Sequence, residues 1–238
     1  MFGVDPLTTG ALLILAASNN QICQMPQPTK INVKPTAQKV EFDYSKSLKE
    51  LQATQTDTIN PYDFTGISHT LGFARGAIQT EVRVKLGQQY LPRYKAVCVW
   101  YEEVNIGFKI DPEITIAKEV AADRCKGKAV KEHELKHVKA DRRIVNKYAK
   151  IIGKKVYNDL KARGFVAGPV RVSDTEVVSE RMQRTVLQIV EREGKRMDLD
   201  RADAQQAVDS LEEYERVGKL CPKWDAKAAL AGKTKPKR

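Results

Sequence analysis

The chain has 238 residues, of which 42% are hydrophobic, so it is long enough to bury a core of its own. Lys and Arg number 41 against 30 Asp and Glu, and the resulting net charge of +11 suits an acidic partner such as an anionic envelope surface. The basic residues are spread along the chain and no nucleic-acid-binding motif occurs, so we expect no specific nucleic-acid partner.

A short apolar run lies near the N-terminus. Residues 11–17 (ALLILAA) are too few to span a bilayer, and small residues follow them as at a signal-peptide cleavage site. We therefore predict a signal peptide over residues 1–18 and an exported protein, periplasmic or extracellular. The lack of Lys or Arg before Lys30 is atypical of a signal peptide, and a buried or membrane-associated segment is the alternative.

Residues 19–61 are polar and contain several prolines, which predicts an extended linker with little regular structure apart from a short strand near residues 39–42. A compact domain is predicted over residues 62–222. Its first half contains segments rich in β-branched and aromatic residues, which are typical of strands. The predicted strands are residues 77–86, 96–110 and 113–120.

After Cys125 the apolar residues recur at helical spacing. Strands that precede helices indicate an α+β fold, in which an antiparallel sheet of three to four strands packs on a helix and a helical C-terminal region follows. Residues 223–238 are small and basic and predict a disordered tail. The predicted helices are residues 131–152, 155–163 and 173–218, the last with an interruption near Gly194.

The chain contains four widely spaced cysteines, without a CxxC pair. Scattered cysteines in an exported protein predict two disulfides rather than a four-thiolate zinc site. We expect Cys98 to pair with Cys125, which would join the middle strand to the following helix, and Cys23 to pair with Cys221. Other pairings remain open, and four buried free thiols are the alternative.

The predicted helix 131–152 contains two histidines at the spacing of a zinc site. His133, Glu134 and His137 form the pattern HExxH, which places both imidazoles on one side of a helix, where one metal ion can contact both. Glu134 would face the same space and act as the catalytic general base, accepting a proton from metal-bound water. The pattern therefore predicts a zinc-dependent hydrolase.

The face of this helix supports the metal prediction. At about 100° per residue, His133, Glu134, His137 and Asp141 share one stripe with apolar residues, whereas the Lys and Arg residues lie outside it. Burying the two carboxylates without partners is costly, and a bound cation removes that cost. A polar pocket with hydrogen-bonded histidines and no metal is the alternative.

Asp141 is the nearest candidate for a third zinc ligand. It lies about 6 Å of helix rise beyond His137, too far along the helix to share a metal with both imidazoles. We predict instead that Asp141 accepts a hydrogen bond from the second ring nitrogen of His137. An ion pair with Arg142 or a neighbouring Lys is the alternative.

The motif and its preceding strands resemble the zincin metallopeptidases, and among them the uncharacterised family of predicted secreted zinc-dependent proteases. In glutamate-type zincins the third ligand comes from a later helix, so the resemblance implies Glu176 or Glu180. The third ligand stays open, with Glu180 slightly ahead of Glu176 and of His69, the one other histidine in the sequence. The resemblance also implies that an edge strand, such as residues 113–120, holds extended substrate.

The motif and the resemblance together predict a zinc metallopeptidase acting on a peptide or protein substrate. An amidase acting on cell-wall peptides would share this chemistry. Tyr148 lies on the ligand stripe, where it would stabilise an oxyanion or simply pack in the core. The alternative from another class is a non-catalytic zincin-like component of a cell-envelope assembly, with a structural or binding role.

Overall fold

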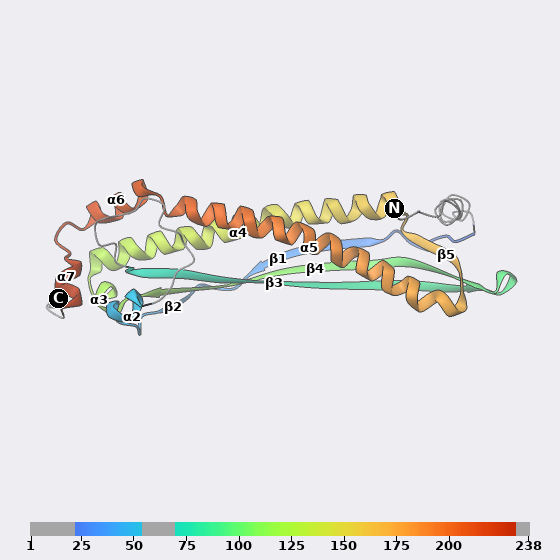
Figure 1. The fold of residues 1–238 in the computed structure, drawn as a ribbon, viewed down its shortest axis with the longest axis horizontal. Helices are drawn as coiled ribbons and strands as arrows, with labels where there is room; N and C mark the ends of the chain where they lie inside the picture. Colours follow the sequence, from blue (N-terminus) through green and yellow to red (C-terminus); the bar gives the residue numbers. More distant parts are fainter. Residues whose placement is uncertain (1–21, 54–69, 232–238) are drawn as a thin grey trace, which may run out of the picture. The chain divides into compact units, whose positions relative to one another are not determined.

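The computed structural model describes residues 22–53 and 70–231 (Figure 1). The predicted signal peptide, His69 and the last residues of the predicted tail lie outside these ranges. Within them, no helix combines the length and the hydropathy that crossing a membrane requires. The elements in chain order are β1 (Lys30–Ala37), β2 (Glu41–Asp43), α2 (Leu48–Gln52), β3 (Gly72–Leu91), η2 (Pro92–Tyr94), β4 (Ala96–Ile116), α3 (Lys118–Ala121), α4 (Arg124–Arg163), β5 (Val166–Arg171), η3 (Val172–Asp174), α5 (Thr175–Val208), α6 (Leu211–Leu220) and α7 (Ala226–Leu230).

Strand β4 is the centre of a five-stranded sheet, because β1, β2, β3 and β5 all pair with it. β2 runs parallel to β4, with Phe42 opposite Ile114, and β5 runs antiparallel to it, with Ala96 opposite Arg171. The prediction of an antiparallel sheet of three to four strands is therefore wrong in strand number and in direction. The strands that were not predicted are β1, which contains Pro35, and β5, which contains Gly168 and Pro169, whereas β2 overlaps the short strand predicted near residues 39–42.

The main elements are longer than predicted. The two predicted strands after residue 96 form one strand of 21 residues, β4, which Pro112 does not interrupt. The helices predicted on either side of Gly153 likewise form one helix of 40 residues, α4. Gly153 lies where an added Cβ would come within 3.2 Å of Val33 Cγ2, so the glycine permits close packing against β1 instead of ending the helix.

The chain divides into two compact units, and β1, β3, β4, α4 and α5 each have a part in both. The first unit comprises the described residues up to Lys34 together with Glu81–Gly107 and Lys150–Glu193. The second unit comprises the described residues of Pro35–Thr80 and Gly194–Arg238, together with Phe108–Ala149.

The core of the first unit lies on β4. Tyr101 is buried, and its hydroxyl donates a hydrogen bond of 2.8 Å to the backbone oxygen of Met182 on α5. Thr29 Oγ1 donates in turn to the backbone oxygen of Tyr101 at 2.7 Å. A disulfide between Cys23 and Cys98 fixes the segment that precedes β1 to the same strand.

The second disulfide joins Cys125 to Cys221, so both cysteine pairs predicted as partners are wrong, although the expectation of two disulfides is confirmed. The physical reason is the continuity of β4. Cys98 lies near the start of this strand, in the first unit, and Cys125 follows its end, in the second, so each cysteine pairs with another of its own unit.

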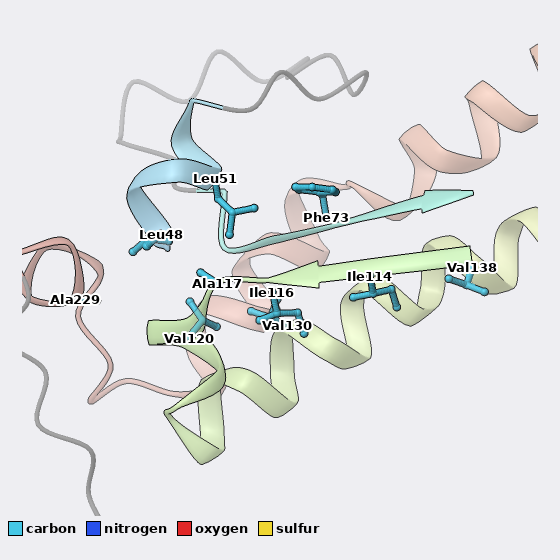
Figure 2. Close-up of a cluster of buried hydrophobic side chains, with 10 residues drawn as sticks. All are labelled: Leu48, Leu51, Phe73, Ile114, Ile116, Ala117, Val120, Val130, Val138 and Ala229. Carbon is cyan, nitrogen blue, oxygen red and sulfur yellow. The ribbon is translucent and has the colours of Figure 1, made fainter. Parts of the chain in front are cut away.

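The second unit is built around a cluster of buried apolar side chains from α2, β3, β4, α3, α4 and α7 (Figure 2). Ser47 begins α2 with a capping box, in which its side chain accepts from the backbone N–H of Glu50 and Glu50 bonds back to Ser47. This helix places Leu48 and Leu51 in the cluster, where they are 1% and 0% exposed. The members are Leu48, Leu51, Phe73, Ile114, Ile116, Ala117, Val120, Val130, Val138 and Ala229.

Two segments predicted to contain little or no regular structure are therefore folded, and β2 overlaps the short strand predicted near residues 39–42. The described part of the predicted linker contains β1, β2 and α2, and the described part of the predicted tail contains α7, whose Ala229 is buried. Both segments are polar overall, so their few apolar residues do not form a period long enough to detect in the sequence.

The buried position of α2 can be tested by substitution. Leu51→Ala is expected to lower the free energy of unfolding by about 2–5 kcal/mol, because it deletes a fully buried side chain. Leu199→Ala, at a position that is 69% exposed, should change it by less than about 0.5 kcal/mol. Chemical denaturation of the two variants measures both values, and equal effects would contradict the packing of α2 in the core.

Candidate metal centre

The predicted HExxH residues lie on α4, and their side chains face the interior of the second unit. The helix is continuous through this segment, which places His133 and His137 on the same side. His133 is 8% exposed and Glu134 is 4% exposed, while the His137 side chain is 11% exposed. One potential ligand atom from each residue lies within 4.8 Å of the others, so the group can bind a metal ion.

Asp209 adjoins both histidines and is not among the predicted ligands. Its Oδ1 atom is 3.2 Å from Nε2 of His133 and 3.2 Å from Nε2 of His137. Asp209 follows the last residue of α5 and is 4% exposed. One buried carboxylate oxygen is therefore shared by two imidazoles.

The charges of this trio are coupled. Burial alone would raise the pKa of Asp209, but the hydrogen bonds with His133 and His137 outweigh it and hold this pKa well below its usual range. Burial likewise opposes the protonated form of His137, yet the hydrogen bond with Asp209 leaves its pKa raised. Asp209 is therefore a carboxylate that favours a cation beside it.

Glu134 lies against β3. Burial raises the pKa of Glu134 to about 7, although both histidines and a hydrogen bond from the backbone N–H of Ala74 act in the opposite direction. A Cβ added at Gly72 would come within 2.9 Å of the Thr115 backbone oxygen and within 3.3 Å of Glu134 Oε1. Glycine at this position therefore lets β3 approach the glutamate closely.

Glu213 on α6 contacts the second ring nitrogen of His133. Its Oε1 atom is 3.3 Å from His133 Nδ1, and its carboxylate also pairs with Lys136 at 2.5 Å and Arg216 at 2.7 Å. The hydrogen bonds from Arg216, followed by those from Lys136 and His133, lower the pKa of Glu213 to about 2 in spite of burial. The ionised Glu213 carboxylate at Nδ1 fixes the orientation of the His133 ring, and Nε2 then points to Asp209.

Gln205 on α5 contacts the Nδ1 atom of His137, as Glu213 contacts that of His133. Its Oε1 atom lies 2.5 Å from His137 Nδ1, and its Nε2 donates to the His137 backbone oxygen at 3.2 Å and to Asp141 Oδ1 at 2.5 Å. Asp141 is also bound by Arg201, through Nε at 2.7 Å and Nη2 at 2.9 Å. Asp141 thus reaches His137 through Gln205, and its ion pair is with Arg201.

Arg201 extends this network to the sheet, because its Nη2 also donates to the backbone oxygen of Gly76 at 2.7 Å. An added Cβ at Gly76 would come within 2.5 Å of Asp141 Oδ2. Strand β3, helix α4 and helix α5 are therefore joined by hydrogen bonds beside the histidines.

Comparisons with protein-family models, with curated proteins and with solved structures find no match. Function is therefore inferred from the chemistry of the site itself.

The other predicted site residues have different surroundings. Glu180 has a 59% exposed side chain, lies 3.8 Å from Arg184 and is not part of the His–Glu–His group found among the described residues. Glu176 is also exposed. Tyr148 is buried and forms a hydrogen bond with Asp200, whereas Tyr214 is the aromatic residue beside His133, with ring centroids 5.8 Å apart.

The strand predicted to hold substrate, residues 113–120, does not lie at an edge of the sheet. Residues 113–115 belong to the central strand β4 and pair with β2, so the expectation of an edge strand there is wrong. The strand that contacts Glu134 is β3, through Ala74.

Adjacent glutamines provide a matched test of the network. Gln205→Leu is expected to lower the free energy of unfolding by about 1–3 kcal/mol, because it removes hydrogen bonds from buried His137 and Asp141. Gln206 Nε2 is buried without a hydrogen-bond partner in the described part of the chain, so Gln206→Leu should be neutral or slightly stabilising. Denaturant titration with a chelator present compares them, and equal losses would refute the role of Gln205.

Proposed function

We propose that this chain is an exported zinc-dependent peptide hydrolase in which His133, His137 and Asp209 hold the metal and Glu134 is the general base. The observation that carries the proposal is the shared approach of both histidine Nε2 atoms to one Asp209 oxygen, at 3.2 Å each. Asp209 replaces Glu180 as the third ligand in this proposal.

The donor set fits zinc. Two imidazole nitrogens and one carboxylate oxygen are the ligands typical of catalytic zinc, which keeps a further position open. Each histidine has its Nδ1 atom beside a hydrogen-bond acceptor, Glu213 for His133 and Gln205 for His137. Acceptors at Nδ1 fix the ring orientation and leave Nε2 for the metal.

Zinc bound by these residues would supply a Lewis acid that polarises the substrate carbonyl and acidifies water. Glu134 lies in the same group, within 4.8 Å of the histidine nitrogens. Its carboxylate accepts a proton from the attacking water and returns it to the leaving nitrogen. The hydrogen bond from the Ala74 backbone N–H orients this carboxylate during both transfers.

Two further observations support the proposed export of the chain and its proposed source of substrate. The disulfides Cys23–Cys98 and Cys125–Cys221 fit an oxidising compartment, as expected of an exported protein. The net charge of +11 favours approach to an anionic envelope surface, where cell-wall peptides would be available as substrates.

The third ligand can be tested directly. Asp209→Asn is expected to raise the zinc dissociation constant by at least about 100-fold, because loss of an outer-shell partner alone costs 10- to 100-fold. Glu180→Gln should leave the constant unchanged, since its side chain is exposed and pairs with Arg184. Competition with a chromophoric chelator measures both constants. A large loss in Glu180→Gln with none in Asp209→Asn would reject the proposed ligand set.

The general base has its own test. Glu134→Gln should retain zinc and lose at least about 100-fold in peptide hydrolysis, which is the contribution typical of a positioned base. Glu132→Gln is the control, because Glu132 is 52% exposed and pairs with Lys128. Turnover of a diverse labelled-peptide library, with and without chelator, gives the rates. A wild-type protein that binds zinc and cleaves no peptide would instead favour the non-catalytic role.

A further inference from the structure

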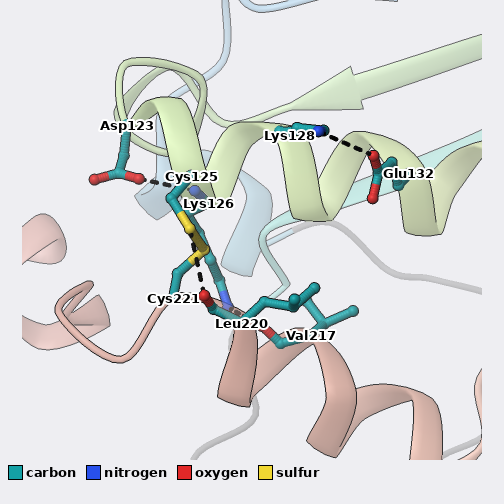
Figure 3. Close-up of a disulfide and its surroundings, with 8 residues drawn as sticks. All are labelled: Asp123, Cys125, Lys126, Lys128, Glu132, Val217, Leu220 and Cys221. Carbon is teal, nitrogen blue, oxygen red and sulfur yellow. Dashed lines mark hydrogen bonds and ion pairs between the residues drawn. A yellow bond between two sulfur atoms is a disulfide. The ribbon is translucent and has the colours of Figure 1, made fainter.

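Helix α6 lies between a metal-site residue and a disulfide. Its N-terminal end follows Asp209 and is capped by Ser210, whose side chain accepts from the Glu213 backbone N–H at 3.3 Å. Its last residue is followed by Cys221, which is bonded to Cys125 in the first turn of α4 (Figure 3). The same helix α4 carries His133, so α6 is tied to α4 by the disulfide after its last residue and by the contact of Asp209 with His133 before its first.

Few apolar side chains are buried beneath α6, although Glu213 contacts His133 and Lys136 on α4. The buried cluster beneath it consists of Ala129, Val217 and Cys221, with Trp224 partly buried against them. Lys126 Nζ donates to the Val217 backbone oxygen at 3.2 Å (Figure 3). Three apolar side chains of the helix remain on the surface: Leu211 is 40% exposed, Tyr214 is 39% exposed and Leu220 is 48% exposed.

We infer that the Cys125–Cys221 disulfide sets the metal affinity of the site by holding α6, and with it Asp209 and Glu213, against the histidines of α4. The inference rests on the metal site of the proposed function. Without the bond, α6 is joined to α5 and α7 by the backbone alone, and the 96-residue separation between the two cysteines is no longer closed. The cysteines act as positioning residues, since neither contacts the histidines in this arrangement.

The two disulfides differ in their access to a reductant. Cys125 is exposed, although its partner Cys221 is 6% exposed, whereas both cysteines of the other bond are buried, Cys23 at 5% and Cys98 at 1% exposed. A dithiol in a reducing compartment can attack the Cys125–Cys221 bond, becoming a disulfide itself while the two cysteines become thiols. The site would therefore gain its full affinity only after the chain reaches an oxidising compartment.

The affinity test compares two double variants with the wild-type protein. Cys125→Ser with Cys221→Ser is expected to raise the zinc dissociation constant at least about tenfold, as loss of an outer-shell partner does. Cys23→Ser with Cys98→Ser, whose bond lies in the first unit, should leave it unchanged. Circular dichroism checks that both remain helical. Equal constants in the wild-type protein and the first variant, or an equal loss in both variants, would overturn the inference.

A second measurement needs no substitution and holds even if a variant fails to fold. Because linkage is reciprocal, zinc should reduce the fraction of Cys125–Cys221 that is reduced at equilibrium. The wild-type protein is equilibrated in a buffer of reduced and oxidised glutathione at a fixed ratio, in which two glutathione thiols become one glutathione disulfide as the protein disulfide becomes two thiols. Alkylation and peptide mapping then give the reduced fraction of each pair with and without zinc.

The outcomes separate this inference from the proposed function. Zinc protection of Cys125–Cys221 beyond any protection of Cys23–Cys98 supports the inference, and equal labelling of Cys125 and Cys221 with and without zinc overturns it. If the wild-type protein binds no zinc, the proposed function fails, and the inference fails with it. Zinc binding that is unaffected by loss of the Cys125–Cys221 bond rejects the inference alone.

Discussion

The buried carboxylate of Asp209 determines how the second unit is arranged around the histidines. Two imidazole nitrogens meet one of its oxygens, and an isolated carboxylate in this position would lose its hydration without compensation. The histidines, or a metal ion beside them, supply that compensation. Asp209 lies beside the histidines because α5 ends at Val208. The residue after Asp209, Ser210, is the N-cap of α6.

Each group around the histidines is held by another element. Glu213 comes from α6 and contacts His133, while Gln205 comes from α5 and contacts His137. Arg201 joins Asp141 on α4 to the Gly76 backbone oxygen on β3. Such a network reduces the rotational freedom of both imidazoles before any ligand binds, which is what pre-organised metal sites require.

The sequence was informative where one short segment carried the whole signal. The spacing of His133, Glu134 and His137 on one helix is a local property, and the structure brings these residues together as predicted. Asp209 could not be identified in this way, because its approach depends on where α5 ends, and its segment read as the interior of a longer helix. The sheet was misjudged for a similar reason: a short strand was predicted near β2, but its parallel direction depends on pairing with β4, far along the chain.

Anomalous diffraction at the zinc absorption edge, from crystals of the zinc-loaded full chain, tests the central claim most directly. Our account predicts a single strong peak in the second unit, within ligating distance of His133 Nε2, His137 Nε2 and an Asp209 carboxylate oxygen. A peak coordinated by other residues, or no peak beside these histidines at saturating zinc, would contradict it.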